Sequence, residues 1–393
     1  MRILDITLFY PPQAGGAVTT TLEFIKALIK CGHEVEVLAP SIRDKVDSVS
    51  PNEAANQEHP DRIVHRIKLI EFFKKWTVCY SYLVYAVKNL RSKEFDAILA
   101  HFHFTTAIGW AGLLLSRIFG CSLYIRIHDL YEPKTFKHKV MFFLNKIPLK
   151  YCTKILTINH VSKQMLIDRR IAPPHKIEII PNGVSGLTYN SEIVKRKNKV
   201  GFLGTISRNR GIDLLIPLIV ELKRDLPDVE IHIVGEGPGL NSLVHKLQEQ
   251  DEVIRNSFII HGALERHKAI EVISGMDVCI GLLERSNTND YQLLIKLIEY
   301  IHLGIPWVSV STKGVEEFYH NTRSGLITNE ELHSITAAIS KLLTNEELYK
   351  EKVSNGLENK SFYDWEYIAW ELNSVLVGNR GVSNESVGVR RSV

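Results

Sequence analysis

The feature that most constrains the fold of this chain is a repeated alternation of short apolar runs with helix-forming runs. Residues 2–9 and 34–39 are apolar and flank a helical pattern over 19–30. The same alternation continues through residues 97–180 and again through 199–310. Because strands joined by helices lie parallel, the pattern predicts parallel α/β sheets.

Length and a polar interruption predict two domains. A chain of 393 residues exceeds one ordinary hydrophobic core. Polar residues follow the turn signal Pro181-Asn-Gly183, and we interpret them as a linker. The predicted parts are a first domain over 1–184, a linker over 185–198, a second domain over 199–361, an amphipathic helix over 362–377 and a disordered tail over 378–393.

Cysteine usage and hydropathy narrow the cellular setting. The five cysteines are scattered without a CxxC pair, which predicts no metal site and no disulfide framework and favours a reducing cytoplasm. No apolar run approaches the ~18 residues that span a bilayer. Asp5 interrupts the first apolar run and no small-residue cleavage site follows, so we expect no signal peptide.

Positive charge is concentrated in the first half of the chain. Residues 1–185 hold 25 Lys and Arg against 16 Asp and Glu, a net of +9, whereas the remainder holds 23 against 28, a net of −5. Residues 62–93 and 134–176 interleave basic and aromatic side chains, which suits an anionic membrane surface or an anionic polymer. The alternative is a solvated helix face whose aromatic side chains point inward. We expect no nucleic-acid partner.

A helical run carries Lys296 and Glu299 on one face and ends at Gly304-Ile-Pro306. A carboxylate near the end of an α/β unit can accept hydrogen bonds from two neighbouring hydroxyls, such as those of a ribose. The alternative interpretation is an ordinary ion pair between residues three apart.

Glycine turns and histidines also follow predicted strands. Gly16 opens a helix, where the backbone can approach an anionic ligand closely. Arg208 and Arg210 lie in a similar turn and could clamp a diphosphate. His101-Phe-His103 and His128-Asp129 end two strands, where open α/β sheets bind ligands, although a lone histidine is more often structural.

Together these blocks resemble the family-4 glycosyltransferases, which are retaining, nucleotide-sugar-dependent enzymes of the GT-B architecture. The resemblance implies two Rossmann-like domains that face each other across a cleft, with residues 362–377 crossing back to the first domain. The matching segments run in the family's order through nearly the whole chain: Gly15-Gly16, His128-Asp129, 180–184, 204–215, 233–238 and 296–306.

The resemblance implies a nucleotide-sugar donor on the second domain and an acceptor on the first. Glu299 would hold the ribose hydroxyls, and Arg210 would contact the diphosphate with Arg208 or Lys296 as helper. In the first domain, His128 would reach the donor sugar and Gly16 would present its backbone N–H to the phosphate.

One departure from the family concerns the donor sugar. Tyr291 stands eight residues before Glu299, where the family has the first glutamate of a pair, so we place Tyr291 on the donor-sugar side and leave the sugar open. The chain has no Asp-x-Asp that would hold a divalent metal. Because two arginines could replace the metal, we expect metal-independent transfer without a cofactor.

We therefore expect a cytoplasmic hexosyltransferase, peripheral at the inner face of a membrane. It would move a sugar to a glycan or lipid-linked acceptor in cell-envelope or surface polysaccharide biosynthesis. One alternative is a nucleotide-sugar epimerase of the same architecture, which would isomerise the donor without an acceptor. The other is a non-catalytic sugar-binding module, which would bind the donor tightly without forming product.

Overall fold

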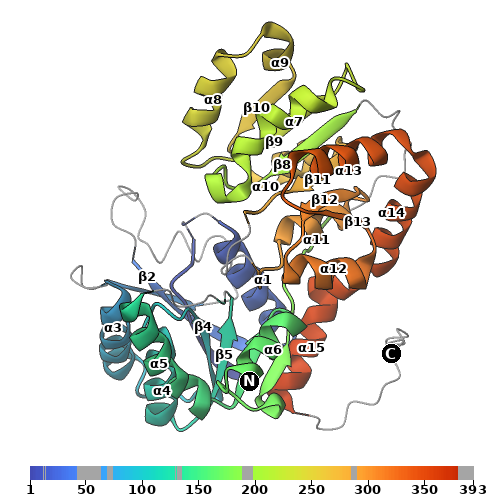
Figure 1. Cartoon of the computed structure of the whole chain (residues 1–393). Helices are drawn as coiled ribbons and strands as arrows, with labels where there is room; N and C mark the ends of the chain where they lie inside the picture. The colour runs from blue at the N-terminus through green and yellow to red at the C-terminus, as the bar shows by residue number, and fades with distance from the viewer. Residues whose placement is uncertain are drawn as a thin grey trace.

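The computed structural model describes residues 1–11, 13, 15–41, 63–68, 74–128, 130, 135–187, 198–284 and 290–378. Several predicted features lie outside these residues. They are Asp129, most of the linker, the tail beyond Gly378 and the part of the first basic segment that covers residues 69–73. Within the described residues, the chain forms two parallel sheets flanked by helices (Figure 1).

The first sheet has seven described strands in the order β3-β2-β1-β4-β5-β6-β7. Every pairing between neighbours is parallel. The strands are β1 Arg2–Ile6, β2 Glu34–Pro40, β3 Ile63–Ile67, β4 Ala97–Phe102, β5 Ser122–Ile127, β6 Lys154–Thr157 and β7 Ile177–Ile179. The helices are α1 Gly16–Lys30, α3 Lys74–Asn89, α4 Ile108–Phe119, α5 Phe136–Tyr151 and α6 His160–Asp168, with the short turn η1 Pro174–Lys176.

The second sheet has six described strands in the order β10-β9-β8-β11-β12-β13. They are β8 Lys199–Leu203, β9 Glu230–Val234, β10 Phe258–Gly262, β11 Val278–Gly281, β12 Trp307–Val310 and β13 Gly325–Thr328. The helices are α7 Leu215–Leu222, α8 Leu240–Gln248, α9 Glu252–Asn256, α10 Arg266–Ser274, α11 Ile295–His302, α12 Lys313–Thr322, α13 Leu332–Thr344 and α14 Glu346–Asn359, with the turns η2 Arg208–Arg210, η3 Ile212–Leu214 and η4 Lys360–Tyr363. The predicted fold class, two Rossmann-like α/β domains, is confirmed.

The last described helix, α15 (Trp365–Val377), lies against the first sheet's helix α1 rather than against the second sheet (Figure 1). The indole of Trp365 meets the ring of Phe24 edge to face, with centroids 6.1 Å apart. The Tyr124 hydroxyl donates a hydrogen bond to the carbonyl of Leu376 at 3.1 Å. One hydrophobic cluster therefore combines α1, the first sheet and α15.

Candidate functional site

Helix α11 is held at the carboxyl ends of the central strands of the second sheet by the side chain of Tyr300. The Tyr300 hydroxyl accepts a hydrogen bond from the backbone N–H of Leu203 at 3.3 Å and donates one to the carbonyl of Ile280 at 3.4 Å. Its ring is fully buried in the core under the helix. These contacts tie α11 to β8 and β11, which fixes the predicted pair Lys296 and Glu299 at this edge.

Lys296 is buried at the edge of the second sheet and faces the loop after β8. Its Nζ lies 4.3 Å from the centroid of the Phe202 ring, and a Cβ added to Gly204 would lie 3.4 Å from it. Within the described residues, Nζ has no hydrogen-bond partner. Burial, followed by the positive charge of Arg210, lowers the pKa of Lys296 to about 7. An anion placed here would meet a donor that nothing else satisfies.

Glu299 is paired with an arginine that the sequence did not single out. Arg266, at the start of α10, donates from Nη1 to Glu299 Oε1 at 2.7 Å. The Glu299 side chain is 7% exposed and that of Arg266 is 49% exposed, so the pair lies at the rim of the site. The predicted partner Lys296 lies one helical turn away on the same helix, and its charge is favoured by Glu299.

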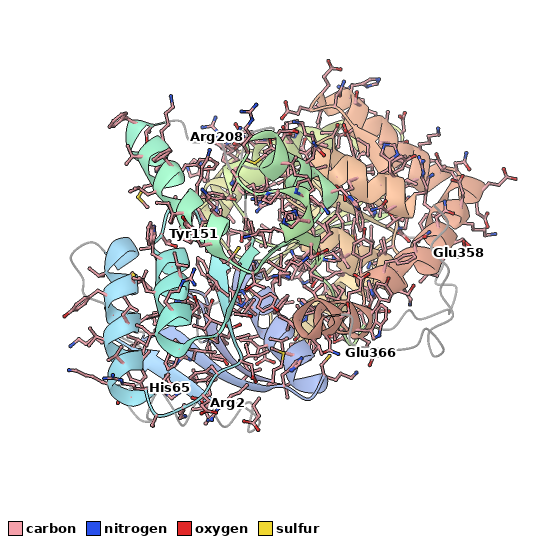
Figure 2. All side chains as sticks on the ribbon, turned by 90° about the horizontal axis from the view of Figure 1, so that it is seen from below. Arg2, His65, Tyr151, Arg208, Glu358 and Glu366 are labelled. Atoms are coloured by element: carbon pink, nitrogen blue, oxygen red, sulfur yellow. The ribbon has the colours of Figure 1, made fainter. Side chains whose placement is uncertain are left out.

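The two predicted arginines of the first turn point in different directions. Arg210 lies close enough to Lys296 to lower the pKa of that lysine. The Arg208 side chain is 90% exposed at the surface, and its Nε lies 3.3 Å from Asp213 Oδ2 (Figure 2). In a 3₁₀ turn, side chains two positions apart point about 120° apart. The structure therefore brings Arg210, but not Arg208, together with Lys296.

The turn at Gly235-Glu-Gly237 serves packing between two loops. Gly235 has φ +141°, and a Cβ added to it would lie 2.0 Å from the carbonyl oxygen of Gly204. A Cβ added to Gly237 would lie 2.3 Å from the carbonyl oxygen of Ile206. These glycines let the loop after β9 pass directly over the loop after β8, which favours the interpretation of this segment as a tight turn.

Gly16 is the first residue of α1 and belongs to the first domain. Gly15 precedes it with φ +130°, a conformation that favours glycine. A Cβ added to Gly16 would lie 3.6 Å from Cδ1 of Ile295, the first residue of α11. The N-terminus of α1, where backbone N–H groups have no partner within the helix, thus lies beside the start of α11.

His128 follows β5 and ends a chain of buried hydrogen-bonding groups. Its Nε2 lies 2.7 Å from Nδ1 of His101, and Nε2 of His101 lies 2.9 Å from Oδ2 of Asp5. Burial, followed by the charges of His101 and Arg126, lowers the pKa of His128 well below its ordinary value. The sequence pointed to His101 and His128 but gave Asp5 no role in the site.

Tyr291 packs between the two domains. Its ring joins the hydrophobic cluster of the first domain and lies 5.5 Å from Nζ of Lys313. The side chain of Asn159, which precedes α6, donates a hydrogen bond to the Tyr291 carbonyl at 3.0 Å. Near it, the Glu317 carboxylate of α12 accepts hydrogen bonds from the first two backbone N–H groups of α6, at 2.8 and 2.9 Å. These contacts give Tyr291 a place in interdomain packing.

The described part of the chain holds no group of three or more His, Cys, Asp or Glu side chains placed to bind a metal ion. The expected metal independence of the reaction stays a prediction. None of the described helices combines the length and the apolarity that a bilayer crossing requires.

Aromatic side chains of the basic segments point in both directions. Phe142 of α5 and Tyr82 of α3 are buried, as the inward-facing alternative expects. Phe136 and Phe143 of α5 are 82% and 69% exposed, and Tyr80 of α3 is 62% exposed. The outward-facing aromatic side chains keep a surface interaction open for α5.

Solved structures of other proteins share this fold. Sucrose-phosphate synthase from Thermosynechococcus elongatus aligns with a TM-score of 0.75 and 16% identity, over 95% of this chain and 98% of that chain. HepE from Anabaena, solved in complex with UDP-glucose, aligns with a TM-score of 0.73 and 16% identity, over 96% and 99%. The fold is that of the GT-B glycosyltransferases.

The chain belongs to the family-4 glycosyltransferases. The family description "Glycosyltransferase Family 4" matches residues 14–185, and "Glycosyl transferases group 1" matches residues 197–345. The protein is thus a nucleotide-sugar-dependent glycosyltransferase.

Curated relatives of the chain include enzymes named for lipid acceptors. A phosphatidylinositol N-acetylglucosaminyltransferase protein of Arabidopsis thaliana is 24% identical over 403 residues, which cover 98% of this chain and 84% of the relative. Alpha-monoglucosyldiacylglycerol synthase of Acholeplasma laidlawii is 25% identical over 273 residues, which cover 61% and 64%.

Proposed function

We propose that the protein is a retaining hexosyltransferase that takes a sugar from a nucleoside diphosphate donor bound on the second domain. The observation that carries this proposal is the buried Lys296 Nζ, without a hydrogen-bond partner among the described residues, one helical turn from the carboxylate of Glu299. A cation and a carboxylate at this spacing match a diphosphate and the adjacent ribose. Homologous HepE was solved with UDP-glucose, which supports a donor of this chemical class.

In this proposal the protein's own cations stabilise the leaving group. Breaking the bond between sugar and phosphate places negative charge on the diphosphate, and fixed cations near that charge lower the barrier. Lys296 and Arg210 supply the cations, and the N–H of Gly16 adds a donor from the facing helix terminus. Glu299 orients the ribose, and His128 contacts the sugar from the first domain. No metal is needed for these steps.

Replacement of Glu299 tests the donor site. Release of UDP from labelled nucleotide sugars, in the presence of membranes, should fall at least about 10²-fold in Glu299→Ala, because the ribose loses its acceptor. Glu331→Ala, an exposed carboxylate before α13, is the matched control and should keep the parent rate. Equal rates for Glu299→Ala and Glu331→Ala would show that the donor does not bind at α11.

For the acceptor, we propose a lipid-linked molecule at the cytoplasmic face of a membrane, in the synthesis of an envelope or surface polysaccharide. Helix α5 supports this proposal, because Phe136, Val140 and Phe143 are exposed at positions 0, 4 and 7 of one helix face. Exposed Lys139 and Lys150 lie on the same helix, and basic groups beside apolar ones favour anionic lipid surfaces. All five cysteines are free, as a reducing compartment favours.

Sedimentation with vesicles tests the membrane proposal. The protein should bind vesicles that contain phosphatidylglycerol, and binding should weaken as salt rises. The double variant Phe136→Ser/Phe143→Ser should lose most of this binding, whereas Val253→Ser, an exposed apolar residue of α9 in the second domain, should not. Binding that is absent at low salt, or unchanged in the double variant, would reject α5 as the membrane face.

A further inference from the structure

Three neighbouring strands of the first sheet bring Asp5, His101 and His128 into one line. Asp5 lies on β1, His101 on β4 and His128 directly after β5, and these strands are adjacent in the sheet. Asp5 and His101 are 0% exposed and His128 is 9% exposed. A ligand can therefore meet this chain of groups only at His128.

The charges around Asp5 indicate that His101 is neutral. Arg126 of β5 is buried, and although burial lowers its pKa to about 9, the carboxylate of Asp5 raises it, so Arg126 stays charged at neutral pH. One carboxylate thus already faces one buried cation. A second proton on His101 would add another buried cation without a counter-ion, which is costly.

With His101 neutral, the order of donors and acceptors follows from chemistry. A carboxylate accepts, so Nε2 of His101 carries its proton toward Asp5 at 2.9 Å. The other nitrogen of His101, Nδ1, then has only a lone pair and must accept from His128 Nε2 at 2.7 Å. His128, neutral as well, keeps an unprotonated Nδ1.

We propose that Asp5 and His101 are positioning residues that hold His128 in the tautomer with its proton on Nε2. Nδ1 of His128 is then a fixed acceptor for a hydroxyl of the donor sugar. This inference rests on the proposed function, in which His128 contacts that sugar. The stacked ring of His103, parallel to that of His128 within 8° at 5.7 Å, holds the imidazole plane in place.

The proton positions can be measured without any variant. In ¹⁵N-histidine-labelled protein, two-bond ¹H–¹⁵N correlation spectra distinguish a protonated from a bare ring nitrogen, and the spectrum of His128→Gln assigns the His128 signals. We expect His128 with a protonated Nε2 and a bare Nδ1. A proton on Nδ1 of His128 would overturn the proposal.

Asp5→Asn tests the link to catalysis, because an amide no longer enforces the direction of the chain. With UDP-glucose and UDP-N-acetylglucosamine as probes, kcat/KM for UDP release should fall roughly 10²-fold, as expected when a catalytic histidine loses its oriented tautomer. His101→Phe, which keeps a ring but removes both nitrogens, should lose a similar factor. In folded Asp5→Asn, the His128 spectrum should also change.

The matched control is Glu36→Gln, another buried carboxylate of the first sheet that is hydrogen-bonded to a histidine, His65, at 2.8 Å. Arg2 and His65, which both contact Glu36, are labelled in Figure 2. Glu36→Gln should lower the melting temperature and leave the His128 spectrum and kcat/KM unchanged. Equal kcat/KM values for Asp5→Asn and Glu36→Gln would refute a positioning role.

The failure of this inference is distinguishable from failure of the proposed function. A parent protein that releases no UDP from any nucleotide sugar would reject the proposed function, and the tautomer of His128 would still be read from the spectrum. A parent that turns over the donor while Asp5→Asn does so equally well would reject the positioning role alone.

Discussion

Lys296 makes a quantitative prediction about the pH dependence of nucleotide binding. Its pKa of about 7 in the free protein results mainly from burial, with Arg210 lowering it further. A bound diphosphate brings negative charge to Nζ and should return the pKa toward its ordinary value of about 10.4. Binding of UDP then requires a proton that the free protein lacks above pH 7.

The sign and size of the effect follow from linkage. Because the complex holds one proton more than the free protein, affinity falls as pH rises, by up to about 1.4 kcal/mol per pH unit. Between pH 7 and pH 9 the Kd for UDP should rise about 50-fold. The phosphate itself, with a second pKa near 6, is already ionised and adds little in this range.

Isothermal titration calorimetry measures this linkage directly. Titrations with UDP at pH 8 in two buffers of different ionisation enthalpy should show uptake of about 0.9 proton per UDP bound. Lys296→Met keeps the length of the side chain without its charge and should take up almost none. Lys268→Met, on the exposed face of α10, is the control and should behave as the parent. A Kd that does not change with pH, or equal uptake in Lys296→Met, would refute the coupling.

Three further predictions concern stability. Tyr300→Phe removes the hydroxyl that links α11 to two strands and should lower the free energy of unfolding by about 1–2 kcal/mol in urea titrations. Gly235→Ala forces a Cβ against a backbone carbonyl at φ +141° and should cost about 3 kcal/mol and weaken UDP binding. Burial alone would raise the pKa of Glu36, but hydrogen bonds from His65 and two cations hold it at about 2. Stability present above pH 4.5 should therefore fall as pH drops toward 2, and Glu36→Gln should lack this dependence in melting curves.

Local patterns predicted the elements that carry the donor site. Helix α11 ends where Gly304 and Pro306 indicate, and Lys296 and Glu299 lie on it one turn apart because that spacing is a property of the helix. The partner of Glu299 was missed, because Arg266 lies 33 residues earlier and reaches it only through the order of the strands. Arg208 was placed by its type and neighbours, whereas a 3₁₀ turn directs it to solvent.

Two edge strands, β3 and β13, were not predicted. Ile63–Ile67 lies within a basic segment and was interpreted by its charge, and Gly325–Thr328 is only four residues long. The link from Asp5 to His101 spans 96 residues and depends on β4 lying beside β1, which apolar patterns along the chain do not contain. Tyr291 likewise meets the first domain through a tertiary contact.

The return of α15 to the first sheet has a consequence for synthesis on the ribosome. One face of that sheet packs on α1, and the hydrophobic cluster there includes Trp365, Ile368 and Leu372. A nascent chain that has emerged only as far as β7 leaves this apolar surface facing water until the whole second sheet has followed. The half of the molecule that is translated first is thus completed last, and a chaperone that covers apolar surface would have its longest period of contact with α1.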